Sequence, residues 1–448
     1  MTFIHTELRP GAYADSVSLL QVSRDVAAAR GVEAAQVAMA TPLNLDVLAQ
    51  MGFDLPSSAS NDMVVALRLV DESALPGALA AVEAALASVR TRGSAESGSV
   101  TVPPYTTGSA LRRTAARPGP ALISVPGASA FVEAVDALEA GVDVMVFSDN
   151  IPLHQEVRLK EIANDGGLLV MGPDCGTAVL GGVGLGFANV VAPGPVGIVA
   201  ASGTGCQQLL ALLDAAGVGV GAALGVGGRD LSAEVGAIST RTALARLDAD
   251  PAIERIVLVS KPPAPEVAAA VGEYAERLDT PVDLALLGAG GSDLTAAASA
   301  VLAGLDRPVP RWPTWGERAT PGGGQYLRGL FVGGTLCDEA MLLAARHLGP
   351  ILSNIPLSPG HALDHLLGPT LTGPGHTMVD FGDDALTRGR AHPMIDPGLR
   401  LEHLARAAAD RSTAVILLDL VLGHGAEPDP AGTLAPAIAA ARATRAAE

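Results

Sequence analysis

The chain has 448 residues, a length that suggests about three domains. Its formal net charge of −18 argues against nucleic acid or an anionic membrane surface as a partner. The three cysteines are odd in number and lack CxxC spacing, so the sequence predicts neither a disulfide scaffold nor a zinc ribbon, and no metal site.

Residues 1–93 mix helix-like and strand-like segments and predict a small α/β domain, with a ferredoxin-like arrangement as one option. The helical segments are DSVSLLQVSRDVAAARG and GALAAVEAALASV, and the strand-like ones are AAQVAMATP and NDMVVALRLV. The opening segment MTFIHTELRPG lacks the basic-then-apolar pattern of a signal peptide, and we expect a cytoplasmic protein. Residues 94–117, rich in Gly and Ser, predict a linker.

Residues 118–192 alternate strands and helices, from ALISVPG to LLVMGPDC, and predict a doubly wound parallel sheet. Residues 193–305 repeat this pattern and include the strand-like segment IERIVLVSKPP. Residues 306–326, rich in Pro, Trp and Gly, predict a second linker, and residues 327–448 a last, shortened α/β domain. The expected fold class is therefore α/β, with several Rossmann- or flavodoxin-like domains after a small N-terminal one.

Residues 175–213 carry no charged side chain and are long enough to span a bilayer. Glycine and proline interrupt this stretch throughout, however, and strands buried on both faces of a parallel sheet look equally uncharged. The sequence therefore favours a protein without a membrane span.

A buried strand runs into a helix through a glycine-rich turn in GIVAASGTGCQQLLALL, where Ser202, Gly203, Thr204 and Gly205 form the turn. The first N–H groups of a helix lack intrahelical partners and attract anions. The turn has no Lys for a Walker loop, and Gln208 stands where a dinucleotide fingerprint needs Gly or Ala. We therefore predict an anion site of another kind.

A second turn of this type occurs in GLFVGGTLCDEAMLLAA, at Gly333, Gly334 and Thr335. Either turn alone is better explained as a tight strand-to-helix connection. Two such turns in consecutive α/β domains favour helix N-termini that converge on one anion.

Longer motifs carry a family resemblance. The segments MGPDCGTAVL, GPVGIVAASGTGCQQLL and GVGGRDLSAEVGAIS resemble the α subunit of succinyl-CoA synthetase and related NDP-forming acyl-CoA synthetases, and FVGGTLCDEA resembles the phosphate-binding turn of the β subunit. With VMGPDCGT, VGGRDLS, SKPP, HTMVDFGDD and HPMIDP in order, the chain resembles the FdrA family. That resemblance implies an oligomeric subunit of a carbamoyltransferase that acts, with partner subunits, on oxamate and oxalurate in allantoin breakdown.

The resemblance also implies site residues. In the synthetases two helix N-termini hold the phosphate of a phosphohistidine, and the matching positions are Ser202, Gly203 and Thr204 with Gly333, Gly334 and Thr335. The histidine itself is missing, because LLGAGGSD occupies its place and no histidine occurs between His154 and His347. The glycine-rich CoA loop is not found ahead of residue 118, so no cofactor is predicted with certainty and CoA binding is doubtful. The chain stops at AIAAARATRAAE, where longer members continue, and a partner could complete the last sheet.

Carbamoyl transfer from carbamoyl phosphate is compatible with the missing histidine and the missing CoA loop. The substrate is already activated, so the protein needs no nucleophile of its own. Alignment of the reactants alone supplies up to about 7–11 kcal/mol of the barrier. Arg229 could clamp a substrate carboxylate; pairing with Asp230 or Glu234 explains it equally well. Asp174 ends a strand where ligands bind in such folds, or only forms a turn.

The polar segment GHTMVDFGDDALTRGRAHPMIDP supplies further candidates or is a solvated loop whose charges pair internally. We predict His392 as a general acid or base and His376, Asp383 and Arg390 as substrate contacts. Its other charged residues are Asp380, Asp384, Arg388 and Asp396. Cys206 and Cys337 lie just inside the two helices, and small apolar packing is the favoured role for both.

Three functions remain open at this level. The leading one is carbamoyl transfer between carbamoyl phosphate and a small amide such as oxamate or oxalurate. The second is an NDP-forming acyl-CoA ligase that borrows a histidine such as His376 or His392. The third is an anion-binding or assembly subunit whose chemistry resides in its partners.

Overall fold

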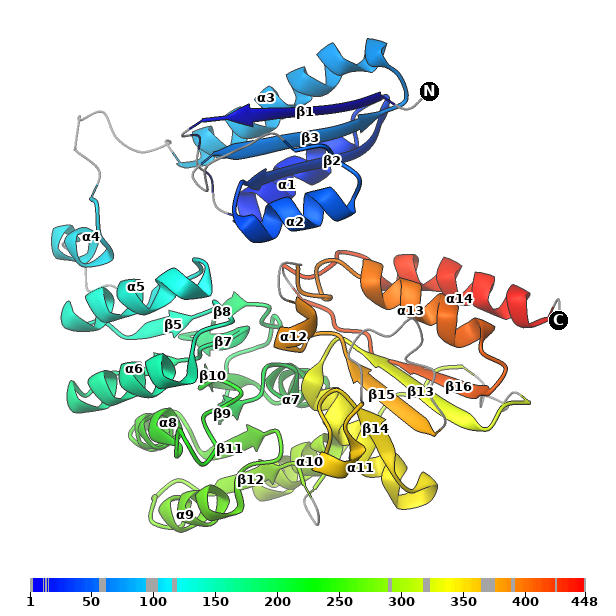
Figure 1. Cartoon of the computed structure of the whole chain (residues 1–448). Helices are drawn as coiled ribbons and strands as arrows, with labels where there is room; N and C mark the ends of the chain where they lie inside the picture. The colour runs from blue at the N-terminus through cyan, green and yellow to red at the C-terminus, as the bar shows by residue number, and fades with distance from the viewer. Residues whose placement is uncertain are drawn as a thin grey trace. The chain divides into compact units, whose positions relative to one another are not determined.

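A computed structural model gives the fold of the chain. It describes residues 3–10, 12, 14, 16–55, 62–93, 104–114, 119–288, 292–316, 323–363, 375–387, 391–423 and 425–446. The chain divides into two compact units, Met1–Pro103 and Pro104–Glu448. Figure 1 shows the helices and strands of both units.

The first unit is a three-stranded antiparallel sheet with the strand order β1-β3-β2. Its strands are β1 (Phe3–Arg9), β2 (Val32–Met39) and β3 (Met63–Leu69), and its helices are α1 (Ser16–Ala27), α2 (Pro42–Gln50), η1 (Glu72–Ala74) and α3 (Leu75–Gly93). The central strand β3 is buried at every position except Arg68, because α1 and α3 pack on one face and α2 lies against the other. The strand order is that of a ferredoxin-like fold without its last strand.

The second unit begins with a three-stranded parallel sheet of order β4-β5-β6. Its elements are β4 (Ala121–Ile123), β5 (Val144–Val146), β6 (Val170–Met171), α4 (Thr107–Arg113), α5 (Gly127–Glu139) and α6 (Leu153–Asp165). The parallel strands alternate with helices, as the sequence predicts.

A six-stranded sheet of order β12-β11-β9-β10-β7-β8 follows. Its strands are β7 (Thr177–Leu180), β8 (Val183–Gly186), β9 (Val196–Ala201), β10 (Val220–Gly225), β11 (Arg255–Ser260) and β12 (Val282–Leu286), and its helices are α7 (Gly203–Ala215), α8 (Ile238–Asp248), α9 (Pro265–Ala275) and α10 (Leu294–Gly304). Four strands are parallel, whereas β7 pairs with β10 in the antiparallel direction. The hairpin β7–β8, which the sequence assigns to residues 118–192, thus belongs to the sheet of the following segment.

The last sheet has four parallel strands in the order β14-β15-β13-β16. Its elements are β13 (Tyr326–Phe331), α11 (Gly334–Leu348), β14 (Ile351–Ser353), η2 (Pro359–His361), β15 (His376–Asp380), α12 (Asp384–Thr387), α13 (Gly398–Ala409), β16 (Thr413–Leu418) and α14 (Pro430–Ala446). Helices α13 and α14 cover one face of this sheet and α11 the other (Figure 1). Neighbouring side chains on β13 point to opposite faces, so Leu330 packs toward α13 and α14, and Phe331 toward α11. These sheets confirm the predicted α/β class.

The two glycine-rich turns follow the carboxyl ends of central parallel strands. The first connects β9 to α7, and the second connects β13 to α11. Ligands bind at this edge in open parallel sheets, because the helix N-termini collect there. Among the described residues, no helix is both long and apolar enough to cross a membrane.

Candidate functional site

The two glycine-rich turns meet. Ser202 Oγ lies 2.6 Å from Thr335 Oγ1, so the turns are in direct hydrogen-bond contact. The helices behind them, α7 and α11, pack against each other. A Cβ atom on Gly333 would lie only 2.8 Å from the side chain of Thr204. The structure therefore brings together the six residues predicted to bind phosphate; their role as phosphate ligands stays a prediction.

The first turn is organised by its own N-cap. Ser202 has an extended backbone, and its Oγ accepts a hydrogen bond of 2.9 Å from Gly205 N. This leaves Gly203 N and Thr204 N as the first amides of α7, which no carbonyl of the helix can reach. A Cβ on Gly203 would meet no atom within 4 Å, so the space in front of this turn is open.

The second turn is partly occupied by the protein itself. Asp419, directly after β16, accepts hydrogen bonds from Val332 N at 3.0 Å and from Gly333 N at 2.9 Å. The amide of Gly333, one of the predicted phosphate ligands, is therefore already bonded to Asp419. Gly334 and Thr335 provide the next amides of α11. Arg400 lies 3.3 Å from Asp419 and balances its charge.

Lys261 is a site residue that the sequence does not single out. It follows β11 and lies beside the start of α11, because a Cβ on Gly334 would be 2.7 Å from Lys261 Nζ. Burial alone would lower the pKa of Lys261, but four carboxylates outweigh this effect and raise the pKa. These are Asp380, Asp338, Asp174 and Asp383. A signal was available, because Lys261 is one of two lysines in the chain and directly follows a buried strand.

Asp380 has the largest effect of the four carboxylates on the pKa of this lysine. The same Cβ on Gly334 would lie 2.5 Å from Asp380 Oδ2. The side chain of Asn354 accepts from Asp380 N and donates to Asp380 O, and Gly382 N donates to Asp380 Oδ1 at 2.8 Å. Burial raises the pKa of Asp380 to about 6, against the opposing charge of Lys261.

Asp338 adds a second buried acid, on the second turn of α11. Burial, opposed by Lys261 and assisted by Asp380, raises its pKa to about 7. Near neutral pH the site therefore holds one full positive charge and acids that are close to their titration points. Such groups can take up or release protons during a reaction.

His392 lies at this site. Its Nδ1 accepts a hydrogen bond of 3.2 Å from Met394 N, which leaves the ring proton on Nε2. A Cβ on Gly382 would lie 2.7 Å from Nε2 and 3.1 Å from Asp380 Oδ1, so ring and carboxylate face the same point. Burial lowers the pKa of His392 to about 4. At neutral pH the ring is uncharged and presents an N–H donor, an arrangement that suits polarisation of a carbonyl better than removal of a proton.

Two other predicted residues lie elsewhere. Arg229 donates through Nε to Glu156 Oε2 at 2.8 Å, in a network with Lys160, and not to Asp230 or Glu234. His376 begins β15, the opposite end of the strand from Asp380, and its Nδ1 accepts from Leu327 N at 3.0 Å. Neither side chain reaches the two turns, because one is held in an ion pair and the other is at the wrong edge of the sheet.

The remaining residues predicted to contact substrate do not lie together. Asp383 precedes α12, accepts from Ala385 N at 3.0 Å, and acts electrostatically on Lys261. Arg390 and Arg388 lie outside the described residues. Asp174 lies in a small recess beside the first turn, together with Ser202 and Gly203.

Burial makes the cysteine thiols poor nucleophiles in this arrangement. Burial raises the pKa of Cys175 to about 12 and raises the pKa values of Cys206 and Cys337 as well. All three are buried and reduced. Their neutral thiols therefore serve as small apolar groups in the core.

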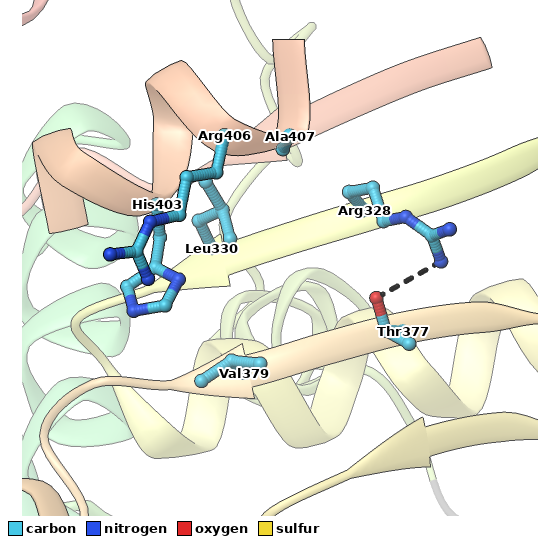
Figure 2. Close-up of a pocket in the computed structure, with 7 residues that line it drawn as sticks. All are labelled: Arg328, Leu330, Thr377, Val379, His403, Arg406 and Ala407. Carbon is cyan, nitrogen blue, oxygen red and sulfur yellow. Dashed lines mark hydrogen bonds between the residues drawn. The ribbon is translucent and has the colours of Figure 1, made fainter. Parts of the chain in front are cut away.

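A separate small pocket lies between α13 and the sheet face formed by β13 and β15 (Figure 2). Its lining residues are Arg328, Leu330, Thr377, Val379, His403, Arg406 and Ala407. Arg328 Nη1 donates to Thr377 Oγ1 at 3.3 Å, and burial lowers the pKa of His403. The pocket is on a covered face of the sheet and contains none of the predicted site residues.

The parallel sheets and the paired helix N-termini define a multidomain α/β protein, and two family profiles match parts of it. A profile described as CoA-ligase matches residues 330–447, and one described as the AllF heavy metal-associated domain matches residues 1–102. The uncharacterised protein YahF of Escherichia coli K12 is 38% identical over 98% of this chain and 88% of its own length. The chain belongs to the YahF family, the FdrA-like group to which its motifs point.

Relatives with named activities match a smaller part of this chain than YahF does. The α-2 subunit of a succinate–CoA ligase from Trichomonas vaginalis is 28% identical over 31% of this chain and 46% of its own length. The corresponding α subunit from Methanothermobacter thermautotrophicus is 30% identical over 38% of this chain and 57% of its own length. These matches span about half of each ligase subunit.

A solved structure is also similar to this chain. The dinucleotide-forming acetyl-coenzyme A synthetase 1 of Ca. Korarchaeum cryptofilum, in complex with phosphate and ADP, is 15% identical to this chain. It covers 77% of this chain and 76% of its own length, with a TM-score of 0.35.

The name of the N-terminal profile implies a heavy metal, but the residues do not fit one. Residues 1–103 contain no cysteine and a single histidine, His5, which lies 3.5 Å from Glu7. Soft metals select thiolate ligands. No group of three metal-ligating side chains occurs among the residues that the structure describes.

Proposed function

We propose that the chain catalyses a group transfer at an acyl phosphate, with the phosphoryl group held between the starts of α7 and α11. One observation carries this proposal: the 2.6 Å contact between Ser202 and Thr335, which brings two helix N-termini and Lys261 to one place. Each helix end contributes about half a positive charge. Together with the ammonium of Lys261 they suit a phosphate leaving group.

The other side chains of the site supply the rest of the reaction. A nucleophile attacks the acyl carbon, the bond from that carbon to the phosphate oxygen breaks, and phosphate leaves with the bonding electrons. The Nε2–H of His392 would polarise the acyl carbonyl. Asp380, with its pKa near 6, would accept the proton that the nucleophile loses.

An acyl-CoA ligase reaction is the first specific form of this chemistry, and the comparisons favour it over carbamoyl transfer. The CoA-ligase profile covers the second turn, and the relatives with named activities include succinate–CoA ligase α subunits. In this form a nucleoside triphosphate first supplies the phosphoryl group of the acyl phosphate, a CoA thiol is the nucleophile that attacks the acyl carbon, and inorganic phosphate leaves. His392 is the histidine of the described site that could carry the phosphate, since residues 286–293 contain none.

Carbamoyl transfer to a small amide is the second form, and the missing histidine favours it. A carbamoyl phosphate substrate needs no phosphoryl carrier, only a site for the leaving phosphate and an aligned acceptor. Arg229 would not hold the acceptor carboxylate, because Glu156 already engages it. Partner subunits would then supply the missing contacts.

Product assays with the full-length chain separate these forms, with and without proteins encoded beside it. Acyl-CoA and nucleotide formation supports the ligase, and phosphate release from carbamoyl phosphate that depends on oxamate supports carbamoyl transfer. Phosphate binding without any turnover identifies a binding subunit.

Variants test the site itself. Lys261→Met and Thr335→Val should each weaken binding of inorganic phosphate, Lys261→Met by about tenfold or more because a charged hydrogen-bond donor is lost. Arg158→Met, which removes an exposed cation from α6, is the matched control and should bind phosphate normally. Normal phosphate binding by both site variants would contradict the proposed site.

A further inference from the structure

Strand β1 (Phe3–Arg9) is an edge of the sheet in the first unit (Figure 1). In the described part of the chain, β3 is the only strand that pairs with it. Every second residue of an edge strand directs its N–H and C=O groups away from the sheet, where another strand can bond to them. Proteins commonly protect such an edge with a bulge, a proline or a covering group, and the two edges of this sheet differ in that protection.

The edge at β2 is protected. Its pairing with β3 shifts register between Val32 and Ala34, which interrupts the regular ladder. Val37 N donates a hydrogen bond of 2.8 Å to the buried Ser23 Oγ of α1, so a helix side chain already occupies an outward amide of this strand. A further strand therefore finds a poor template at β2.

The edge at β1 is regular. All seven residues pair with β3 in one unbroken register, from Phe3 opposite Leu69 to Arg9 opposite Met63. The strand contains neither proline nor glycine, and Ile4 within it is 45% exposed. These features make β1 a template for another strand, and its side chains indicate which one.

The side chains of β1 alternate between the two faces of the sheet. One face carries His5, Glu7 and Arg9. Arg9 donates to Glu7 Oε1 at 2.7 Å, whereas the His5 ring lies 3.5 Å from Glu7 Oε2, so this second oxygen has capacity for a closer donor. The other face carries the apolar Ile4 and Leu8. Complementary groups thus stand on either side of the strand's centre.

We propose that β1 pairs with β1 of a second copy of the chain, antiparallel and with Thr6 opposite Thr6 at a two-fold axis. All seven residues of the strand then have a partner. Each His5 faces Glu7 of the second copy, and each Ile4 faces Leu8 of the second copy. Both faces of the joined sheet are therefore complementary, as a self-paired surface in a symmetric dimer requires.

Charge and strand length select this register. The neighbouring registers that keep paired side chains on one face are centred on His5 or on Glu7. Each of them leaves two of the seven residues of the strand without a partner. A centre on Glu7 also sets two carboxylates opposite each other, and a centre on His5 sets two imidazoles opposite each other. The centre on Thr6 avoids both arrangements.

Cysteine substitutions in the full-length chain test contact and register together. Thr6→Cys should give a disulfide-linked dimer under mild oxidation, because directly opposite Cβ atoms in an antiparallel pair lie about 5 Å apart. Ile4→Cys is the matched control: the two positions would be about 13 Å apart along the strand, so no link should form. The cysteines already present, Cys175, Cys206 and Cys337, are buried and do not compete. Non-reducing electrophoresis separates the products.

Charge reversal tests the same pairing without a covalent link. His5→Glu places a carboxylate opposite Glu7 at two symmetric positions and should raise the dissociation constant of the dimer by about tenfold. Glu7→Lys should also weaken self-association, and a mixture of the two variants should associate more tightly than either alone, because opposite charges then meet. Glu33→Lys on β2 is the matched control and should behave as the unaltered chain does. Sedimentation velocity measures each of these samples.

This inference is overturned by an equal yield of linked dimer from Ile4→Cys and Thr6→Cys, by dimerisation that His5→Glu does not change, or by a monomeric unaltered chain. In the last case, protection of the β1 amides from hydrogen exchange would identify another part of the same chain as the partner of β1. Each result leaves the proposed function standing, because every residue of the described phosphate site belongs to the second unit.

Discussion

At the scale of single residues, the site is defined by a buried lysine among acids that titrate near neutral pH. Lys261 and Asp380 Oδ2 lie beside the same point on α11, and Asn354 holds the backbone of Asp380 in place. The charge that an incoming anion meets therefore depends on how many of these acids are ionised. Protonation and anion binding should be linked.

This linkage predicts a pH dependence. Because burial raises the pKa of Asp338 to about 7 and that of Asp380 to about 6, both acids gain negative charge as the pH rises from 5 to 8. The affinity for sulfate, which keeps its charge over this range, should fall by about tenfold in total, as like charges approach the ligand.

Calorimetric titration with sulfate at several pH values checks this expectation. Asp338→Asn should remove the part of the decrease that occurs between pH 6 and 8, because the neutral amide cannot ionise. An affinity that rises with pH in the unaltered chain would show that these acids do not face the ligand.

At the scale of elements, two helix starts approach each other because glycine stands where a side chain would collide. Gly333 faces Thr204, and Gly334 faces Asp380 and Lys261. The corresponding first position of α7, Gly203, faces open space. The two glycine-rich turns therefore have different requirements despite their similar sequences.

A matched pair of substitutions tests this difference. Gly334→Ala should lower the free energy of unfolding by about 1–3 kcal/mol, because the new Cβ forces Asp380 or Lys261 to move. Gly203→Ala should leave stability unchanged or raise it by up to about 1 kcal/mol, because the helix start accepts the methyl group. Denaturant unfolding measures both, and equal destabilisation by the two variants would argue against the close approach of α11.

The same scale shows what sequence could and could not predict. Both turns are predictable because strand, glycine-rich turn and helix start are local patterns. Lys261, Asp419 and Asn354 are not, because strands far apart in the sequence bring them together. His376 shows the converse: it is near Asp380 in the sequence, but a strand separates the two residues by its full length.

At the scale of the whole molecule, a buried ion network joins α6 to the segment after β10. Lys160 Nζ lies 2.8 Å from Glu156 Oε1 and 2.7 Å from Asp230 Oδ1, with the charged groups almost fully buried. Asp230 also accepts from Thr240 N at 2.8 Å. The three-stranded and six-stranded sheets are thereby tied through charges and not only through apolar packing.

Lys160→Met should therefore destabilise the second unit strongly. Removal of the cation takes the charged partner Lys160 from the buried Asp230 and leaves Glu156 with the partly exposed Arg229, at a cost of about 3–5 kcal/mol. Arg229→Met is the matched control: its side chain is 42% exposed and Glu156 keeps Lys160 as a partner, so the loss should be far smaller. Chemical denaturation of the two variants compares them, and similar losses would contradict this account.

The first unit should be dispensable for anion binding, because every residue of the described site belongs to Pro104–Glu448. A chain that begins at residue 104 should fold and bind inorganic phosphate with an unchanged dissociation constant. Circular dichroism and calorimetry check the two parts of this prediction. A folded but inactive chain would show that the first unit contributes to the site.

The sequence predicts a division near residue 193, but the hairpin β7–β8 ends before that position and pairs with β10 across it. A cut there would strip the larger sheet of two strands and leave β10 with an open hydrogen-bonding edge. Open edges recruit strands from other molecules. The segments on either side of residue 193, produced separately, should therefore aggregate, and co-expression of the two should rescue solubility by restoring the missing pairing.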